Sequence, residues 1–197
     1  IQFSNITVID SNTLLKNINS KSYKNLEQYN LIINEDGKIS IIAQTHIGVS
    51  FALSTLQQLI EQNDDKNDNL NCLCIKNLPI NINDTPNTYF RCVMLDTARN
   101  YFSVDSIINL IKVMGYHKLN YLNWHISDDQ SFPLSVGHIT KIFSEKKSID
   151  PTFKNMTGAF DINKVYRYND IRKIVETAYN YGITIIPGID SPGHCSA

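Results

Sequence analysis

The second half of the chain alternates between short continuous apolar runs and stretches whose apolar residues recur at helical spacing. The apolar runs are residues 90–96 (FRCVMLD), 119–126 (LNYLNWHI) and 183–189 (ITIIPGI). Each run has the length of a strand and is apolar on both faces, which is typical of strands buried between two layers. Because a crossover helix lets successive strands run in the same direction, the pattern predicts a parallel sheet.

The two stretches between these runs each have the apolar stripe of a helix. The stripe of the first consists of Ile107, Ile108, Ile111 and Met114. The stripe of the second follows the spacing i, i+3, i+4, i+7 and consists of Ile171, Ile174, Val175 and Ala178. Ser103 is the predicted N-cap of the first helix, Asn169 is that of the second, and Gly182 is predicted to stop the second. Strand, helix, strand, helix, strand in this order indicates an α/β fold.

The first half has a different pattern. Residues 29–34 (YNLIIN) and 38–43 (KISIIA) flank the turn signal at residues 35–37, which predicts a hairpin. Residues 47–60 have apolar positions at helical spacing, and residues 72–82 hold one or two further strand candidates. We expect a small α+β layer in which one helix covers a sheet.

The change of pattern near residue 88 divides the chain into two predicted domains, residues 1–87 and 88–197. A hydrophobic content of 42% in 197 residues is enough for a real core, and the net charge is −1. So balanced a charge argues against a nucleic-acid partner, and no apolar run approaches the roughly 20 residues of a membrane span. The four cysteines lack the spacing of a paired-cysteine zinc site.

Acidic groups follow all three predicted parallel strands, and a histidine also follows the third. Asp96 follows the first strand, Asp128 and Asp129 follow the second, and Asp190 and His194 follow the third. Because the carboxyl ends of parallel strands meet at one edge, where ligands bind in α/β folds, these side chains are expected to gather there. Carboxylates and a histidine in one cleft favour either acid/base chemistry on a hydroxyl-rich substrate or a metal site.

The metal alternative has a candidate ligand set in His125, Asp128, Asp190 and His194. It lacks two usual sequence signals, a His-x-His pair on the first strand and two histidines at the helical i, i+4 spacing. We therefore predict no metal and no cofactor, and keep a metal-dependent hydrolase as the less favoured alternative.

Two loop motifs carry a family resemblance. Residues 125–133 (HISDDQSFP) follow the second strand, and residues 190–194 (DSPGH) follow the third. With the Arg-led first strand, they resemble the β-N-acetylhexosaminidases of glycoside hydrolase family 20 across residues 91–194. The first half is similar to the small α+β domain that precedes the barrel in that family. The implied fold is an incomplete TIM (β/α)8 barrel, limited to its first three strands, after a small α+β domain.

The resemblance implies roles for four residues. Asp128 and His194 are the implied catalytic pair, hydrogen-bonded in series toward a catalytic acid. Arg91 matches an arginine that binds hydroxyl groups of the terminal sugar, and His125 lines the same pocket. Strand geometry alone predicts a structural role for Arg91, because it lies at the start of its strand, and suggests Asp96 as its ion-pair partner.

Three further aspartates are expected to support the site. By the resemblance, Asp190 begins the third loop motif and fixes that loop, and Asp96 and Asp129 are supporting residues. Trp124 is out of phase with His125 along the strand, so we expect it to pack between the sheet and a helix.

The implied chemistry is substrate-assisted retaining hydrolysis, in which the acetamido oxygen of the substrate attacks the anomeric carbon. The family's catalytic Asp–Glu dyad follows the fourth barrel strand, so it is expected beyond residue 197. Three strand-helix units do not close an eight-stranded barrel. We therefore expect the remainder of the polypeptide, or a second processed chain, to complete the barrel.

The resemblance implies a glycan ending in N-acetylhexosamine as the substrate, a lysosomal or secreted location, and a homodimer as one option. It leaves open the choice between gluco and galacto sugars. A noncatalytic subunit of the same family, which binds sugar or a partner protein, remains the main alternative to an enzyme.

Overall fold

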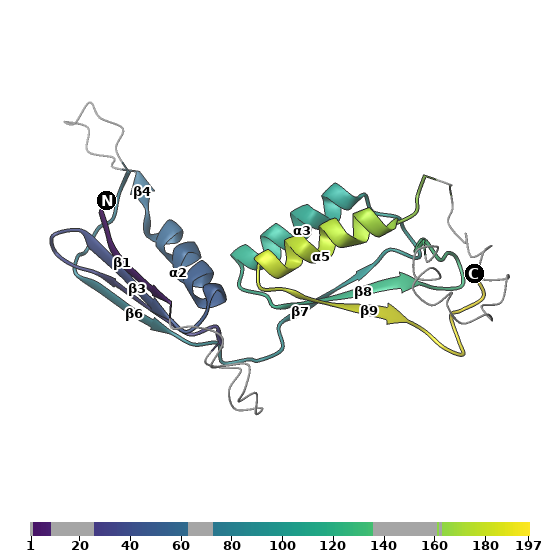
Figure 1. Cartoon of the computed structure of the whole chain (residues 1–197), viewed down its shortest axis with the longest axis horizontal. Helices are drawn as coiled ribbons and strands as arrows, with labels where there is room; N and C mark the ends of the chain where they lie inside the picture. Colours follow the sequence, from purple (N-terminus) through teal and green to yellow (C-terminus); the bar gives the residue numbers. More distant parts are fainter. Residues whose placement is uncertain (1, 9–25, 63–72, 136–160, 162) are drawn as a thin grey trace, which may run out of the picture. The chain divides into compact units, whose positions relative to one another are not determined.

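The computed structural model describes residues 2–8, 26–62, 73–135, 161 and 163–197. The chain forms two compact units, Ile1–Tyr89 and Phe90–Ala197 (Figure 1). No helix in the described part of the chain is both long enough and apolar enough to cross a membrane.

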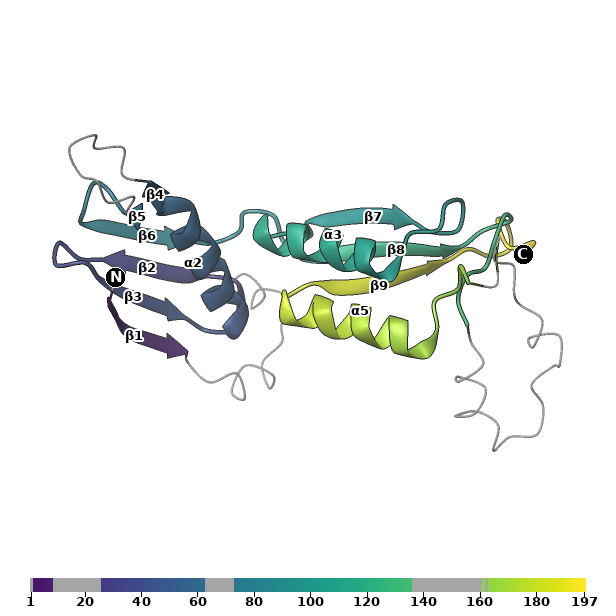
Figure 2. The same cartoon turned by 90° about the horizontal axis from the view of Figure 1, so that it is seen from above.

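The first unit is a sheet covered by one helix (Figure 2). Its four strands lie in the order β1-β3-β2-β6 and are β1 (Gln2–Val8), β2 (Tyr29–Ile33), β3 (Lys38–Ala43) and β6 (Ile80–Asp84). The pairs β2–β3 and β2–β6 are antiparallel, whereas β1 runs parallel to β3. A short antiparallel pair, β4 (Glu61–Gln62) and β5 (Leu73–Cys74), forms a separate two-stranded sheet.

The hairpin predicted between residues 29 and 43 is present. Gly37 closes its turn at φ +77°, a conformation that glycine adopts without a steric penalty, and Asp36 Oδ1 accepts a hydrogen bond from the Lys38 N–H at 3.2 Å. Helix α2 (His46–Leu59) begins after Thr45, whose hydroxyl accepts a hydrogen bond from the Gly48 N–H.

Helix α2 packs on the sheet through a single apolar core. The buried apolar residues of this core are Tyr29, Leu31, Ile33, Ile39, Ile41, Ala43, Phe51, Ala52 and Leu56. The helix approaches the chain before β2 so closely at Gly48 that a Cβ atom there would lie 2.6 Å from the Gln28 carbonyl oxygen. Alternate residues of β2 are buried, as expected for a sheet with one covered face.

The second unit has three parallel strands with two helices on one face (Figures 1 and 2). The strands β7 (Cys92–Asp96), β8 (Tyr121–Ser127) and β9 (Thr184–Ile189) lie in that order. The helices α3 (Val104–Tyr116) and α5 (Tyr168–Asn180) connect them. The strands, their parallel pairing and the two helices are as the sequence predicts.

The core of this unit lies between the helices and the sheet. Its buried apolar residues are Ile107, Ile108, Ile111, Met114, Leu122, Trp124, Ile126, Tyr166, Ile174, Ala178 and Ile183. Trp124 is 2% exposed and packs in this layer, as its phase along β8 predicts. Ser103 caps α3 by accepting a hydrogen bond from the Ser106 N–H, and Gly182, at φ +69°, follows the end of α5.

The predicted N-cap of α5 is wrong. Helix α5 begins two residues earlier than an Asn169 cap would allow, and its N-cap is Arg167. The carboxylate of Asp170 reaches back and accepts a hydrogen bond from the Arg167 N–H at 2.9 Å. An acidic residue at the third helical position can satisfy the N-cap N–H in this way, so Asn169 lies inside the first turn.

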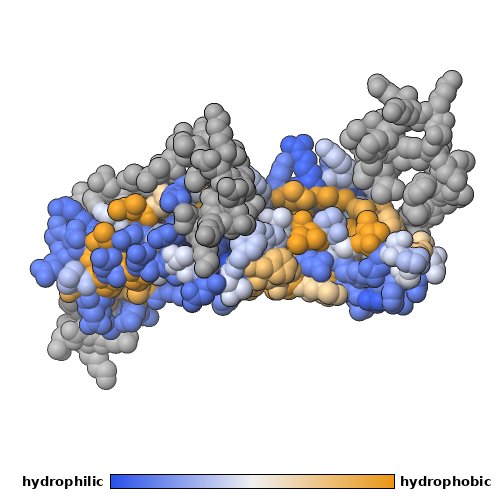
Figure 3. Space-filling view, turned by 90° about the horizontal axis from the view of Figure 1, so that it is seen from below, coloured by the Kyte–Doolittle hydropathy of each residue, from blue (hydrophilic) through white to orange (hydrophobic). Residues whose placement is uncertain are grey.

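The face of the three-stranded sheet away from the helices carries exposed apolar side chains (Figure 3). Met94 and Ile186 are 60% and 38% exposed. Their neighbours along the strands, such as Leu95 and Ile185, point the other way and pack against the helical layer.

Candidate active site

The carboxylate of Asp128 is the centre of the site. Its side chain is completely buried, and in the described part of the chain it accepts hydrogen bonds from four groups. The oxygen Oδ2 contacts Arg99 Nη2 and lies 2.9 Å from His125 Nε2. The oxygen Oδ1 lies 3.1 Å from His194 Nδ1 and 2.7 Å from the Asp129 N–H nitrogen.

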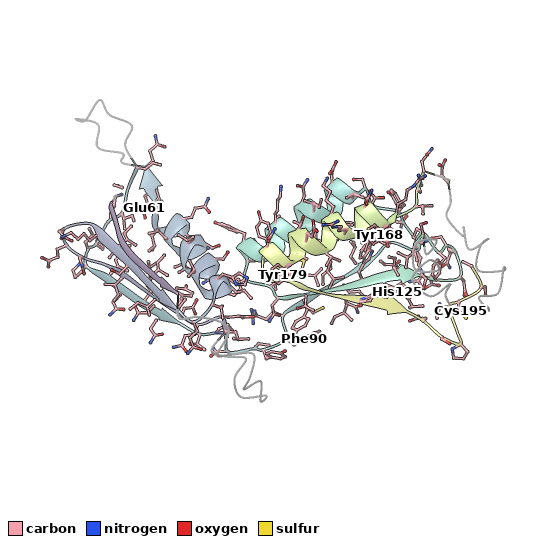
Figure 4. All side chains as sticks on the ribbon, viewed as in Figure 1. Glu61, Phe90, His125, Tyr168, Tyr179 and Cys195 are labelled. Carbon is pink, nitrogen blue, oxygen red and sulfur yellow. The ribbon has the colours of Figure 1, made fainter. Side chains whose placement is uncertain are left out.

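These donors gather at the carboxyl ends of all three strands of the second unit. His125 belongs to β8, opposite Asp96 of β7 in the strand register. Asp128 follows β8, and its own N–H donates to the Ser131 carbonyl oxygen at 3.0 Å. His194 follows β9 and holds φ at +59°, and Figure 4 shows His125 and Cys195 toward the same end of the unit. The predicted meeting of His125, Asp128 and His194 at the carboxyl ends of the strands is therefore observed.

The loop after β7 is joined to the loop after β8. The Thr97 N–H donates to the His125 carbonyl oxygen at 2.9 Å, and the Ser131 hydroxyl donates to the Ala98 carbonyl oxygen. Arg99 adds a third link, since its Nη1 lies 2.6 Å from Asp96 Oδ2 while its Nη2 contacts Asp128. Two parallel strand ends are thus held together by backbone and side-chain bonds.

Sequence reasoning missed Arg99. It lies in the loop after β7, three residues after Asp96, so the rule that placed Asp96 at the ligand edge of the sheet could have placed Arg99 there as well. An exposed arginine in a loop carries no periodic signal, and its contact with Asp128 depends on how the two loops approach each other.

Charge and burial oppose each other at Asp128. Burial alone raises the pKa of this carboxyl group. The hydrogen bonds from the two imidazoles and from the Asp129 N–H, and the positive charge of Arg99, lower the pKa by more than burial raises it. The pKa of Asp128 therefore lies well below its ordinary value, and the carboxylate stays ionised.

Asp96 is similar. Burial raises the pKa of Asp96, but hydrogen bonds from the Arg99 side chain and from the N–H groups of Arg99 and Ala98 lower it below its ordinary value. The hydrogen bond to Asp96 is in turn the main reason that the pKa of Arg99 is raised. The two carboxylates and the guanidinium therefore form a charged cluster at this edge of the sheet.

The remaining predicted aspartates lie around this centre. Asp129 Oδ1 accepts a hydrogen bond from the Ser196 N–H at 3.0 Å, which ties the loop after β8 to the loop after β9. His125, Asp128 and Asp190 form one group in which a ring nitrogen or carboxylate oxygen of each residue lies within 4.8 Å of those of the other two. Asp128, Asp129 and His194 form a second group that meets the same distance limit.

Both groups have the residue types of a metal site, and both depend on Asp128. Each oxygen of Asp128 already accepts two N–H donors, and one of these donors is a guanidinium. A cation here would have to displace these donors and lie close to Arg99, so the arrangement favours a hydrogen-bonded chain over metal binding.

Arg91 does not join the described cluster. It precedes β7, and at roughly 3.3 Å per residue its Cα lies about 16 Å along the strand from that of Asp96. Its Nε donates to the Lys118 carbonyl oxygen at 2.7 Å, and its N–H donates to Asn120 Oδ1. The predicted ion pair with Asp96 is wrong, because Asp96 pairs with Arg99, which is three residues away in the same loop.

A buried aromatic group supports the loop after β7. Trp124 Nε1 donates to the Thr97 hydroxyl at 2.8 Å, and the Tyr166 hydroxyl donates to the Phe102 carbonyl oxygen at 2.6 Å. The Tyr166 ring stacks on Tyr101 and meets Trp124 edge-on, with ring centroids 4.9 and 5.0 Å apart. Burial raises the pKa of Tyr166 to about 12, so its hydroxyl keeps the proton that it donates.

Two family descriptions match the chain. Residues 89–197 match "Glycosyl hydrolase family 20, catalytic domain", and residues 1–59 match "beta-acetyl hexosaminidase like".

Similar proteins agree with these matches. The chain is 37% identical over 203 residues to beta-hexosaminidase subunit B1 of Dictyostelium discoideum. That alignment covers 98% of this chain and 33% of the Dictyostelium protein. The solved structure of the Flavobacterium johnsoniae chitobiase has a TM-score of 0.66 and 28% identity, covering 85% of this chain and 22% of that one. An exo β-N-acetylglucosaminidase from Vibrio harveyi, solved in complex with N-acetylglucosamine, has a TM-score of 0.63 and 28% identity. The match covers 86% of this chain and 26% of the Vibrio harveyi chain.

The chain thus spans about a third or less of the length of these proteins. The catalytic-domain match extends over more than half of its residues and contains the whole Asp128 cluster. On these grounds, the chain belongs to glycosyl hydrolase family 20.

Proposed function

We propose that residues 1–197 are part of an exo-acting β-N-acetylhexosaminidase, which removes terminal non-reducing N-acetyl-β-D-hexosamine residues from glycans. The observation that carries this proposal is the convergence of His125 and His194 on one buried carboxylate, Asp128, within the catalytic-domain match. The names of the relatives and the N-acetylglucosamine bound to the Vibrio harveyi neighbour support the substrate class.

In this proposal, Asp128 and His194 act on the proton of a catalytic acid. An ionised Asp128 accepts a hydrogen bond from His194 Nδ1, so a neutral His194 has its lone pair on the other ring nitrogen, Nε2. A nitrogen of this kind accepts a hydrogen bond from a protonated carboxyl group. The pair would therefore orient a glutamic acid and stabilise the positive charge on the imidazole whenever the proton moves toward it.

The glutamic acid belongs to an Asp–Glu dyad that we place beyond residue 197. The glutamic acid protonates the leaving oxygen, and the aspartate orients the substrate's acetamido group, whose oxygen attacks the anomeric carbon. The bond from the anomeric carbon to the leaving oxygen breaks as the carbon–oxygen bond of the cyclic intermediate forms. Water then opens that intermediate with retention of configuration.

The other residues have supporting roles in this scheme. His125 borders the sugar pocket, and Arg91 binds sugar hydroxyl groups from the amino end of the sheet. Asp190 and Asp129 hold the loop after β9, a role that the Ser196 contact of Asp129 supports.

We further propose that the second unit is the first part of a (β/α)8 barrel. The outer strands β7 and β9 each have one partner among the described strands, whereas a closed barrel has no edges. The exposed apolar face with Met94 and Ile186 would become the barrel interior.

A stripe on α5 also supports a missing neighbour. Tyr168, Val175 and Tyr179 are 50%, 46% and 68% exposed, and at 100° per residue they share one side of the helix. Lys173 contacts Asp105 of α3 from the opposite side. The stripe therefore faces away from α3, where the next helix of a barrel would pack.

The proposal is tested on the complete protein, in which residues 1–197 are joined or bound to the polypeptide that completes the barrel. We expect release of the chromophore from a nitrophenyl N-acetyl-β-hexosaminide, unaffected by chelators. Sugar binding without turnover would instead support a noncatalytic subunit, and loss of activity in chelator would support a metal-dependent hydrolase. Intact mass spectrometry distinguishes one long chain from two processed chains.

A lysosomal or secreted location and a homodimer remain parts of this proposal. Fractionation of the source cells tests the first, and light scattering of the purified complete protein tests the second.

A further inference from the structure

We propose that Arg99 is a positioning residue of this active site, which holds the Asp128 carboxylate so that one of its oxygens faces His194. The inference rests on the proposed glycosidase function and adds to it a residue outside the Asp128, His194 and dyad set. It predicts that Arg99 affects turnover through Asp128, without touching the substrate.

The geometry divides the two oxygens of Asp128 between different partners. Arg99 Nη2 and His125 Nε2 both meet Oδ2, which leaves Oδ1 to His194 Nδ1 and to the Asp129 N–H. A carboxylate that turned about its χ2 bond would lose this division. The two oxygens are chemically equivalent, so the guanidinium fixes the plane of the carboxylate, and with it the direction in which His194 Nδ1 can donate.

Arg99 is itself held at three positions. Its Nη1 lies 2.6 Å from Asp96 Oδ2, its Nε donates to Gln130 Oε1 at 3.2 Å, and its Nη2 contacts Asp128. The planar guanidinium can make these three contacts in different directions at once, which a lysine ammonium on its flexible stem cannot reproduce. Asp96 ends β7 and Gln130 lies in the loop after β8, so these two strand ends jointly set the position of Arg99.

The charges around the guanidinium explain why a cation is needed here. Asp96 and Asp128 contact it directly, and Asp129 and Asp190 lie around Asp128. Among the described residues, the imidazoles of His125 and His194 are the other titratable groups in contact with Asp128. Without Arg99, the two carboxylates would repel each other across the space it occupies, and the loss of its positive charge would favour protonation of the cluster as a whole.

The test compares three variants of the complete protein. Arg99→Met removes the charge, Arg99→Lys keeps it, and Arg172→Met is the control, since Arg172 pairs with Glu176 on the exposed surface of α5. We expect Arg99→Met to lower kcat by on the order of 10²-fold, with KM nearly unchanged. The acidic limb of its kcat/KM profile should move to higher pH.

Arg99→Lys should return the acidic limb toward its original position while recovering only part of kcat, and Arg172→Met should match the parent protein. Circular dichroism of each variant separates these effects from unfolding. The proposal is overturned if Arg99→Met keeps the parent's kcat and pH profile, or if Met and Lys variants lose activity only in proportion to their unfolded fraction.

A parent protein without turnover would count against the proposed function, and a second readout then tests Arg99 on its own. The nitrogen NMR signals of the His194 imidazole report its tautomer and protonation. We expect them to change with pH differently in Arg99→Met and in the parent, and identical titrations would overturn the proposal.

Discussion

His194 Nδ1 lies 3.1 Å from Asp128 Oδ1, although 66 positions separate the two residues in the sequence. The contact exists because β8 and β9 are parallel neighbours, which brings the loops at their carboxyl ends together. It is the link between the fold of the second unit and the proposed proton chemistry.

Removal of the Asp128 charge should disable this chemistry. In the complete protein, we expect Asp128→Asn to lower kcat by at least about 10²-fold, because general acid catalysis typically contributes about 10²- to 10⁴-fold. KM should change little, since Asp128 is buried and does not contact the sugar in the proposed scheme. Steady-state kinetics with a chromogenic substrate measures both constants. Asp105→Asn on the exposed side of α3 is the control, and an equal loss there would contradict the assignment.

Asp128 should also make stability depend on pH. Its pKa is lower in the folded protein than in the unfolded chain, so its stabilising effect is complete above about pH 4, the pKa of an unperturbed aspartate. The effect is lost as the pH falls from there through the pKa of the folded state. Urea unfolding between pH 7 and pH 3, followed by hydrogen exchange of peptides from residues 90–135, measures it. Asp128→Asn should flatten this dependence, and a dependence as steep as the parent's would argue against it.

The hydrogen bond between Trp124 and Thr97 should stabilise the loop after β7. Thr97 is fully buried, and its hydroxyl accepts the Trp124 Nε1–H hydrogen bond at 2.8 Å. Thr97→Val keeps the shape but leaves this donor unsatisfied, which should lower the free energy of unfolding by about 1–3 kcal/mol. Thr97→Ser keeps the hydroxyl and should recover much of that loss. Denaturant unfolding of both variants provides the comparison, and equal stabilities of the two would contradict the role of the hydrogen bond.

In the first unit, two positions on α2 provide a matched pair. Phe51 is 1% exposed and Leu53 is 40% exposed. Phe51→Ala should lower the free energy of unfolding by about 3–5 kcal/mol, because it removes a large buried side chain and leaves a cavity. Leu53→Ala should cost well under half as much. Similar losses in both variants, measured by hydrogen exchange of the β2–β3 hairpin, would mean that α2 does not pack as described.

The pattern of apolar residues was enough to predict the strands and helices of the second unit, because each element buries a continuous apolar stripe or run. It was also enough to bring Asp96, Asp128 and His194 to one edge of the sheet, since parallel strands place their carboxyl ends there. Strand β1 was not predicted. It pairs with β3, where Gln2 lies opposite Lys38, and such a distant parallel partner leaves no local signal in the sequence.

The contacts of individual charged side chains were harder to predict. Arg91 was given Asp96 as its ion-pair partner, and Asn169 was given the N-cap of α5. In both cases a nearer or better placed group makes the contact instead, Arg99 with Asp96 and Asp170 with Arg167. Periodicity determines which face of an element is buried, but it does not determine which of several polar neighbours reaches a given oxygen.

Because one carboxylate receives Arg99, His125 and His194, the energetic effects of changing these three residues cannot be independent. Each single substitution removes one contact of the Asp128 carboxylate and makes its position less well defined. A second substitution at the same carboxylate should therefore have a smaller effect than it has alone. Double-mutant cycles among the three should give coupling energies that are large compared with those of residue pairs elsewhere on the sheet. A natural or engineered variant that replaces one of these three residues would therefore need compensating changes in the other two.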